Sequence, residues 1–258
     1  MAGPKKSLGQ HWLKDRQILS LIADAAEIND SDTVLEIGPG LGTLTSTLLS
    51  RAGRVIAVEL DGALAKKLPG QFPGTALEVI HKDILEYDLS QLPADYIVVA
   101  NVPYYITSKI IKYLMTAPNR PKTMVLLIQK EVAQRLAAQP GDMSILAVSA
   151  QMYAEVELDV IVPAEYFTPP PKVDSQVVVL KTRPKSLVPI EQEAALFRVV
   201  KAGFSSKRKK LRSSLSAGLH LPKEHVDHFL ADQGIDANRR AEDLSIEEWQ
   251  SIVQIVDA

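Results

Sequence analysis

The chain has 258 residues, a formal net charge of −2, 46% hydrophobic residues and 23% charged residues. This composition is typical of an ordinary globular protein and excludes disordered and fibrous classes. The sequence contains no cysteine, which excludes disulfides, thiolate nucleophiles and cysteine-ligated metals. No apolar run approaches the ~18 residues of a membrane-spanning helix, and no secretory signal is recognisable at the amino terminus. We therefore expect a cytoplasmic protein with no membrane partner and no metal.

Strand-like and helix-like segments alternate in the first half of the chain. Five short, branched, apolar segments are typical of strands buried on both faces: 33–37, 54–58, 76–80, 96–100 and 124–128. Helical spacing of apolar residues separates them, and a further amphipathic helix precedes the first strand. This alternation predicts a doubly wound α/β domain with a parallel sheet. Two later strands, 156–162 and 176–181, flank the prolines at 169–171 and should finish the sheet at one edge.

Strand patterns stop after Pro184 and helical spacing follows. Three short amphipathic helices precede a fourth, for which Ser245 and Glu248 have the spacing of a capping box. We therefore expect an α/β domain at 1–184 and a small, all-helical domain at 185–258.

A glycine-rich segment, EIGPGLG from Glu36 to Gly42, follows the first predicted strand and opens a helix. Its glycines, Gly38, Gly40 and Gly42, let a ligand approach the backbone. Glu59 ends the next strand about twenty residues later, where a carboxylate can accept hydrogen bonds from both hydroxyls of a ribose. This spacing predicts an adenosine-containing cofactor, and E-x-G-x-G-x-G resembles the cofactor loop of S-adenosylmethionine-dependent methyltransferases. The alternative is a tight strand–helix turn with a surface glutamate.

Two further polar positions follow the next strands. Asp83 comes directly after the third strand, and Asn101 opens the sequence NVPY after the fourth. Ligands of open α/β sheets bind outside the carboxyl ends of the strands, so both should face the same crevice as the glycine-rich segment. Asp83 could accept a hydrogen bond from an adenine amino group there, or be an ordinary loop aspartate.

The residues of NVPY suit the methylation of a planar nitrogen. An exocyclic amino group is a poor nucleophile because its lone pair is delocalised into the ring. The Asn101 side-chain oxygen and the Pro103 carbonyl can accept its two hydrogens and favour a pyramidal nitrogen, while Tyr104 stacks on the ring. Such positioning catalysis requires no nucleophilic residue, metal or strong base. An Asn-Pro turn with a buried tyrosine is the alternative.

A basic cluster lies in the predicted helical domain, where residues 198–212 include seven basic residues and no acid. Its densest part is a candidate RNA-binding strip formed by Lys207, Arg208, Lys209, Lys210 and Arg212. Clustered basic residues of this kind bind nucleic-acid phosphates. A solvated helix face is the alternative.

Seven pieces of the sequence together resemble the ribosomal RNA adenine N6-dimethyltransferases that act near the 3′ end of small-subunit (16S) rRNA. They are KKSLGQHWL (5–13), EIGPGLG (36–42), VEL with Glu59, KDIL with Asp83, NVPYYI (101–106), FTPPPKVDS (167–175) and RRAEDLS (239–245). The resemblance covers nearly the whole chain. It implies a Rossmann-like methyltransferase domain that uses S-adenosyl-L-methionine and releases S-adenosyl-L-homocysteine. It also implies dimethylation of two adjacent adenosines, by a monomer, within the small ribosomal subunit or its precursor during ribosome biogenesis.

The same resemblance implies the site residues. The cofactor site would be lined by His11, Leu13, Gly38, Glu59, Asp83 and Asn101. Phe167 would stack on the target adenine opposite Tyr104. The chain departs from the usual family residues at Trp12, Val102 and Tyr105, where Phe, Leu and Asn or His are common, but the acceptor pair and the stacking tyrosine are intact.

Several other functions are compatible with parts of this pattern. The related methyltransferases that modify large-subunit rRNA and confer macrolide resistance share the cofactor loop and a similar Asn-x-Pro-Tyr motif, but FTPPPKVDS and RRAEDLS fit the small-subunit group better. DNA-adenine and protein-glutamine methyltransferases share the Asn-Pro-Pro-Tyr chemistry without the GQHWL start. An RNA-binding assembly factor whose methyl transfer is dispensable is the alternative from a different class.

Overall fold

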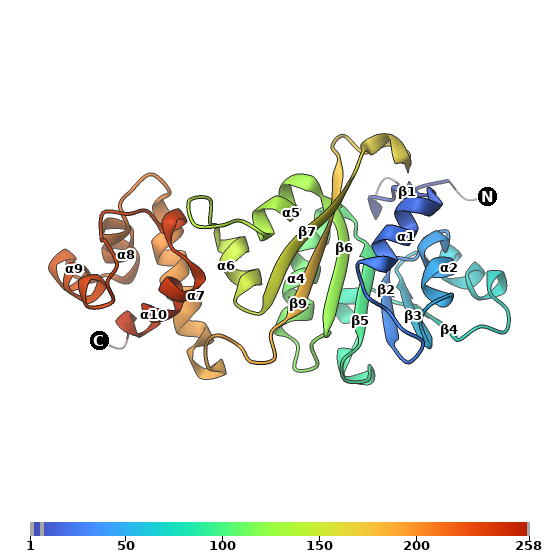
Figure 1. Ribbon diagram of the computed structural model, residues 1–258, viewed down its shortest axis with the longest axis horizontal. Coiled ribbons are helices and arrows are strands. Elements are labelled where there is room, and N and C mark those ends of the chain that lie inside the picture. The colour runs from blue at the N-terminus through green and yellow to red at the C-terminus, as the bar shows by residue number, and fades with distance from the viewer. Residues whose placement is uncertain (1–2, 6–7, 257–258) are drawn as a thin grey trace. The chain divides into compact units, whose positions relative to one another are not determined.

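A computed structural model describes residues 3–5 and 8–256 (Figure 1). Lys6 and Ser7 of the KKSLGQHWL motif lie outside the described residues. The chain forms two compact units: Met1–Ala133 with Glu155–Thr182, and Gln134–Ala154 with Arg183–Ala258. None of the helices within these described ranges is long and apolar enough to span a membrane.

The first unit is built on a seven-stranded sheet of order β4-β3-β2-β5-β6-β9-β7. In that order the strands are Leu77–His81, Arg54–Glu59, Thr33–Ile37, Ile97–Asn101, Thr123–Gln129, Ser175–Thr182 and Ala154–Val162. The first five are parallel, and β9 runs antiparallel to β6. The structure confirms all seven predicted strands to within two residues at each end, and the two late strands do finish the sheet.

Helices flank these strands, as the sequence predicts. They are α1 (Arg16–Asp24), α2 (Thr43–Leu49), α3 (Gly62–Lys67), α4 (Thr107–Thr116) and α5 (Lys130–Leu136). Apolar residues of α1 and α2, such as Ile22 and Leu48, share one core cluster with Val34 of β2. The next residue along β2, Leu35, is also fully buried although it points to the opposite face. Burial on both faces explains why the strands are continuous apolar runs and confirms the doubly wound class.

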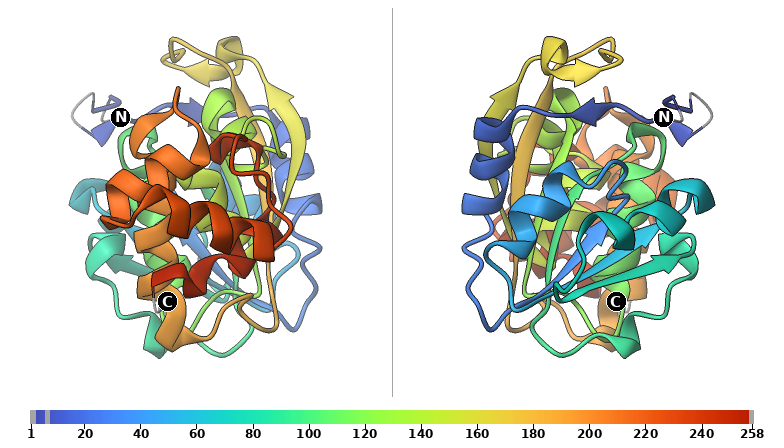
Figure 2. Two further views of the ribbon diagram at one scale, coloured as in Figure 1. Left: turned by 90° about the vertical axis from the view of Figure 1, so that its left-hand side faces the viewer. Right: turned by 90° about the vertical axis from the view of Figure 1, so that its right-hand side faces the viewer.

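A second, two-stranded sheet joins two segments that are far apart in the sequence. β1 (Trp12–Leu13) pairs antiparallel with β8 (Phe167–Thr168), with Leu13 opposite Phe167. Figure 1 and Figure 2 show the blue N-terminal segment beside the end of the yellow loop that carries β8. This pairing brings the GQHWL and FTPPPKVDS motifs together.

The second unit is helical. Its helices are α6 (Ile145–Gln151), α7 (Glu193–Gly203), α8 (Leu211–Leu219), α9 (Lys223–Asp232) and α10 (Ile246–Ser251). Residues 134–154 belong to this unit, whereas the sequence grouped them with the first domain. Long-range backbone bonds account for the difference, because the N–H groups of Gly141 and Met143 donate to the Glu242 carbonyl at 2.8 and 3.1 Å.

The structure confirms the capping box of α10, in which Ser245 Oγ accepts from Glu248 N at 3.2 Å and Glu248 Oε2 accepts from Ser245 N at 2.8 Å. The helix is shorter than its apolar pattern suggested, because it ends at Ser251 and a 3₁₀ turn follows at Val253–Val256. The Arg239 guanidinium contacts Glu248 and the Asp243 carbonyl. The RRAEDLS motif therefore contributes to the internal structure of this unit.

Candidate active site

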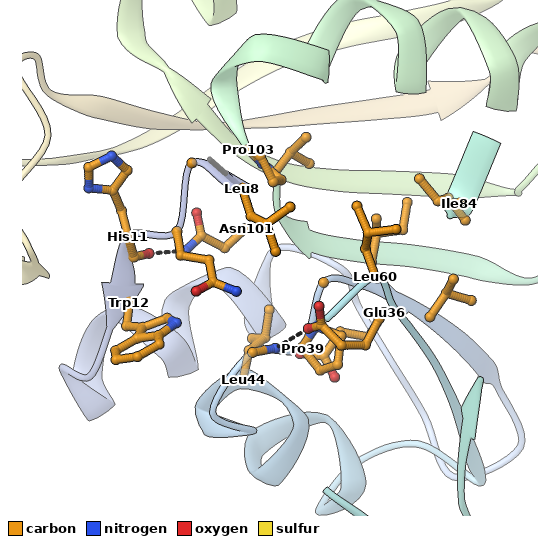
Figure 3. Close-up of a pocket in the computed structure, with 18 of the residues that line it drawn as sticks. Leu8, His11, Trp12, Glu36, Pro39, Leu44, Leu60, Ile84, Asn101 and Pro103 are labelled. Atoms are coloured by element: carbon orange, nitrogen blue, oxygen red, sulfur yellow. Dashed lines mark hydrogen bonds between the residues drawn. The ribbon is translucent and has the colours of Figure 1, made fainter. Parts of the chain in front are cut away.

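One pocket lies at the carboxyl ends of β2, β3 and β5 and is covered by residues 8–13 of the N-terminal segment. Ten predicted site residues line it: His11, Leu13, Glu36, Gly38, Gly40, Glu59, Asp83, Asn101, Pro103 and Tyr104. Figure 3 shows Ile84 and Leu60 at one end of the pocket and His11 and Trp12 at the other. The structure thus brings together the groups that the sequence placed at one sheet edge.

The glycine-rich loop leaves room for a ligand above its backbone. Gly38 has φ +66°, and a side chain built there would meet no atom within 4 Å, while its N–H donates to the Val58 carbonyl at 2.9 Å. Gly42 has a different reason to be glycine, because a Cβ would lie 2.7 Å from Leu68 Cδ1 and 2.9 Å from Phe72 Cε2. Gly42 therefore serves the packing of the loop, whereas Gly38 faces open space.

Glu59 is only 5% exposed, and its carboxylate is held by two backbone N–H groups. Gly40 N donates to Oε2 at 2.9 Å and Asp61 N donates to Oε1 at 2.8 Å. Burial raises the pKa of Glu59, and the hydrogen bonds from Asp61 and Gly40 oppose that rise. Each carboxylate oxygen has lone pairs for a further hydrogen bond, so a fixed acceptor for two hydroxyls lies in the pocket.

Glu36 is 1% exposed and accepts a hydrogen bond from Thr45 Oγ1 at 2.6 Å. Burial raises its pKa to about 8, the Thr45 hydrogen bond opposes the rise, and the nearby Glu59 adds to it. The carboxyl group is therefore mostly protonated at neutral pH. Glu36 lines the pocket, but its side chain accepts a hydrogen bond from Thr45 of α2 inside the fold.

Asp83 lines the pocket beside Ile84. Its Oδ1 accepts from Leu85 N at 2.9 Å and so caps the 3₁₀ turn Ile84–Glu86. This local bond orients the carboxylate, whose other oxygen can accept a hydrogen bond.

Asn101 Nδ2 donates to the His11 carbonyl at 3.0 Å (Figure 3). Since a carbonyl can only accept, this bond fixes the orientation of the amide and leaves Oδ1 as its acceptor atom. The Pro103 carbonyl already accepts from Ile106 N at 3.2 Å and from Thr107 Oγ1 at 3.3 Å. Both bonds are at the long end of the usual range, so an incoming amino group would compete with Thr107.

Tyr104 is fixed by Ser175, with 2.6 Å between Tyr104 Oη and Ser175 Oγ. Ser175 is fully buried at the start of β9. Burial also raises the pKa of Tyr104, which keeps the phenol neutral. Sequence reasoning did not single out Ser175, and only its position at the end of FTPPPKVDS could have indicated it.

The other predicted stacking residue, Phe167, is 3% exposed and packs in the core cluster with Leu13 and Ile18. It is absent from the described residues that line the pocket. The ring that faces Tyr104 is His11, with centroids 5.9 Å apart and planes inclined by 17°. The stacking role of Phe167 stays a prediction.

An ion pair that the sequence did not predict holds the start of the N-terminal segment. Lys5 Nζ lies 2.9 Å from Asp61 Oδ2, and the Asp61 side chain is 4% exposed. The hydrogen bond from Lys5 lowers the pKa of Asp61. Further along, Thr43 Oγ1 donates to the Leu13 carbonyl at 2.8 Å. The segment that covers the pocket is thus attached at both ends.

The basic strip begins after α7 and runs into the first turn of α8, which contains Arg212, in the second unit. Lys207, Arg208, Lys209 and Lys210 are exposed. Arg212 is half-buried and pairs with Asp227 at 3.2 Å. Four of the five predicted RNA-binding residues are therefore accessible to phosphates. The Arg212 side chain is already paired with Asp227 within the helical unit.

Comparison with known proteins identifies the family. A family model described as ribosomal RNA adenine dimethylase matches residues 2–258. The chain belongs to this family. Enzymes of the ribosomal RNA adenine dimethylase family use S-adenosylmethionine, so the chain is a methyltransferase with that cofactor. The Rossmann-like fold class predicted from the sequence is confirmed.

Its relatives within and around this family are similar over most of their length. The chain is 41% identical over 252 residues to "Ribosomal RNA small subunit methyltransferase A" of Dehalococcoides mccartyi strain CBDB1, covering 96% of the chain and 87% of the relative. It is 42% identical to the protein of the same name from Desulfitobacterium hafniense strain DCB-2, covering 97% and 91%. Two crystal structures each have a TM-score of 0.80. The 23S rRNA methyltransferase ErmE is 29% identical, covering 96% of this chain and 100% of its own. A dimethyladenosine transferase from Plasmodium falciparum is 28% identical, covering 94% and 96%.

The residues of the pocket fit the cofactor of the dimethylase family. The space above Gly38 is open, and the two-oxygen acceptor of Glu59 suits the two hydroxyls of a ribose. Ile84 offers an apolar surface next to the Asp83 carboxylate at the same end of the pocket. This set of acceptors and apolar surface matches an adenosine group.

Proposed function

We propose that the chain transfers methyl groups from S-adenosylmethionine to N6 of two adjacent adenosines near the 3′ end of small-subunit (16S) rRNA, giving N6,N6-dimethyladenosines. The observation that carries the proposal is Asn101, whose Oδ1 is oriented as an acceptor beside Tyr104 in the pocket that also contains Glu59. The substrate would be 16S rRNA in the small subunit or its precursor, and the enzyme a cytoplasmic monomer with a role in ribosome biogenesis.

The cofactor would be held by the residues at the strand ends and in the N-terminal segment: His11, Leu13, Glu36, Gly38, Gly40, Glu59, Asp83 and Asn101. Gly42, predicted with them, would act by allowing the loop to pack against Leu68 and Phe72. Glu59 would accept hydrogen bonds from the ribose, and Asp83 one from the adenine amino group. When bound, S-adenosylmethionine supplies a methyl group activated by a sulfonium.

Asn101, Pro103 and Tyr104 would position the target adenine. The Asn101 Oδ1 and the Pro103 carbonyl would accept hydrogen bonds from the amino group and favour a pyramidal nitrogen, with Thr107 giving up its bond to Pro103. Tyr104 would stack on the base and hold it in reach. Methylation makes the nitrogen acidic, so its proton leaves to solvent without a dedicated base.

The helical domain, predicted at 185–258, would hold the RNA, and the methyltransferase domain, predicted at 1–184, would carry the chemistry. The strip of Lys207, Arg208, Lys209, Lys210 and Arg212 would contact phosphates. Such contacts position an RNA without reading its sequence. They are compatible with the chain's net charge of −2, because nine acids after residue 223 offset the basic cluster in the total.

Sequence similarity favours the small subunit over the large one. The fold is equally similar to a 23S rRNA methyltransferase and to a dimethyladenosine transferase, each with a TM-score of 0.80. The relatives named as small-subunit methyltransferases are about 41% identical over 96% of the chain, whereas the 23S enzyme is 29% identical. An assembly factor with dispensable activity would not need the intact acceptor geometry at Asn101.

The test is to incubate the protein with labelled S-adenosylmethionine and unmethylated small or large subunits, and then to identify the modified nucleosides by mass spectrometry. We expect N6,N6-dimethyladenosine at two adjacent positions of 16S rRNA only. Label in the large subunit would support the macrolide-resistance type, and absence of label in both would contradict the assignment as a methyltransferase of rRNA. The Tyr104→Ala variant controls for contaminating activity.

A further inference from the structure

An exposed aromatic side chain lies at the mouth of the pocket. Tyr105 lines the pocket and is 58% exposed, whereas the preceding Tyr104 is partly buried and held by Ser175. Isolated exposed apolar side chains are ordinary on protein surfaces, but this ring directly follows the residues that would receive the target base. The two consecutive tyrosines therefore have different environments at the same site.

The Tyr105 ring is held against the N-terminal segment on the target side of the pocket. A Cβ at Gly9 would lie 3.2 Å from Tyr105 Cδ1, 3.3 Å from Tyr105 Cε1 and 3.7 Å from Pro103 Cβ. The backbone of Gly9 therefore covers one side of the ring and leaves the rest open to solvent. Its other neighbour, Pro103, carries one of the two acceptors proposed for the target amino group, so the ring is next to the place where the base would react.

A cation accompanies the ring. The 3₁₀ turn Tyr104–Ile106 runs directly into α4, which begins at Thr107. Lys109 is exposed and follows Tyr105 by four residues, about one helical turn later. Surfaces that bind single-stranded RNA combine aromatic rings, which stack on bases, with basic side chains, which contact phosphates. The ring and the ammonium group together therefore suit one nucleotide at the mouth of the pocket.

The proposed substrate would present such a nucleotide. An enzyme that modifies a base takes this base out of the stack of its neighbours and into the pocket. The base next to the target then loses a stacking partner and remains outside, close to the mouth. Proteins commonly stack aromatic side chains on bases that have been unstacked in this way.

We propose that Tyr105 stacks on the nucleobase directly next to the target adenosine and so positions the target in the pocket. Tyr105 is thus a positioning residue and takes no part in the transfer itself. The proposal deepens the proposed function and rests on it. Position 105 is also one at which the chain departs from the usual family residues, Asn or His, so the contact distinguishes this chain within the family.

The experiment removes the neighbouring base and the ring separately and together. One of the two adjacent adenosines of 16S rRNA is replaced by an abasic nucleotide, in a synthetic 3′ fragment that is ligated to the rest of the RNA before the small subunit is reconstituted. Two such substrates and the intact one are methylated by the unmodified chain, Tyr105→Leu and Tyr105→Phe. The initial rate is measured for each adenosine at saturating S-adenosylmethionine, so that a change in cofactor affinity does not enter the comparison.

Tyr105→Leu keeps an apolar side chain beside Gly9 but removes the ring. On intact subunits its kcat/KM for the RNA should fall by at least about 5-fold, the lower limit for loss of one base–aromatic stack. Tyr105→Phe keeps the ring and should retain activity within a few-fold. The loss in Tyr105→Leu should disappear on the abasic substrate that lacks the stacked neighbour, because the ring then has no base to contact.

Three results would overturn the proposal: an unchanged kcat/KM of Tyr105→Leu, the same loss on the intact and both abasic substrates, or equal losses in Tyr105→Leu and Tyr105→Phe. The second result would mean that the ring only supports Gly9, and the third that the hydroxyl matters. Thermal unfolding shows whether each variant is folded, and Tyr105→Asn, with a residue common in the family, replaces Tyr105→Leu if that variant is unfolded.

Failure of the proposed function has a different signature. If the unmodified chain methylates large-subunit RNA instead, the proposed function fails, and removal of the base next to that adenosine still tests the stack. If the chain methylates neither RNA, both proposals fail.

Discussion

The two sides of the pocket are held by different kinds of contact. On the cofactor side, Glu59 and Asp83 each accept a hydrogen bond from an N–H group two residues further along the chain, and Glu59 also accepts one from Gly40 N, 19 positions before it. On the target side, the bonds join residues that are 90, 71 and 158 positions apart: Asn101 to His11, Tyr104 to Ser175, and His11 to Pro169. The cofactor side is therefore shaped locally, whereas the target side exists only when the N-terminal segment and the FTPPPKVDS segment have both docked. Substitutions on the cofactor side should therefore change the affinity for S-adenosylmethionine, whereas substitutions on the target side should change the rate of methyl transfer.

The largest effect is expected on the target side, from Tyr104→Ala. Loss of a base stack is worth about 1–3 kcal/mol, and a misplaced reacting group costs about a further 10²-fold, so methyl transfer should fall by at least about 100-fold. Single-turnover methylation of small subunits measures the loss. Calorimetry with S-adenosylmethionine should give an affinity near that of the unmodified chain, and an active Tyr104→Ala enzyme would contradict the mechanism.

On the cofactor side, Glu59→Ala should weaken S-adenosylmethionine binding. Hydrogen bonds to a charged group contribute about 1.5–3 kcal/mol, which corresponds to roughly 10- to 150-fold in Kd. Calorimetry measures this change. Glu78→Gln is the matched control, because Glu78 is an exposed carboxylate on β4 that pairs with Arg54 outside the pocket. Equal affinities for Glu59→Ala and the control would remove Glu59 from the site.

Glu36 predicts a pH dependence of folding stability. Its pKa is raised from 4.5 to about 8 by burial, so between these values the folded state binds a proton that the unfolded state has released. Stability must then decrease as pH rises through this window, by up to about 1.4 kcal/mol per pH unit. Urea unfolding from pH 5 to 8.5 should show a shallower decrease for Glu36→Gln, whose neutral amide can still accept from Thr45. If the free energy of unfolding decreases equally with pH in both proteins, Glu36 is ionised in the folded state and its pKa is not raised by burial.

The sheet and the cofactor side could be predicted from the sequence because their signals are local. Strands buried on both faces are continuous apolar runs, and the carboxyl ends of parallel strands meet at one edge, so Gly38, Glu59, Asp83 and Asn101 had to converge. The capping box at Ser245 is equally local, since its two partners are three residues apart.

The features that the sequence did not predict depend on contacts between residues whose separation along the chain follows no regular spacing. The Lys5–Asp61 ion pair and the Tyr104–Ser175 bond join side chains that have no periodic relationship in the sequence. Residues 134–154 were grouped with the wrong neighbours for the same reason, because their attachment is through the backbone carbonyl of Glu242. Phe167 was assigned a role by resemblance alone, and the structure buries it in the core.

The helical unit should influence RNA binding without influencing either side of the pocket. Replacing Lys207, Lys209 and Lys210 by Gln should flatten the plot of log affinity against log salt by up to about 0.7–0.9 per lost phosphate contact. Filter binding to small subunits across a salt series measures the slope, and methylation at saturating subunit should persist. The control replaces three exposed lysines of the other unit: Lys66, Lys67 and Lys112. An unchanged slope in the first variant would mean that the strip is a solvated face.

The smallest effect tests whether Ser175 acts on the target side through Tyr104. Their 2.6 Å hydrogen bond is partly buried and should be worth about 0.5–1.5 kcal/mol, so Ser175→Ala should lower kcat/KM by roughly 2- to 12-fold and leave cofactor affinity unchanged. Tyr104→Phe keeps the stacking ring and removes the other partner of the same bond. If the bond is what orients the ring, the double variant should be no slower than the slower single variant, because the second substitution has nothing left to remove. Additive losses in this cycle would instead mean that Ser175 and the Tyr104 hydroxyl act independently, and that the docking of FTPPPKVDS does not set the angle at which Tyr104 meets the base.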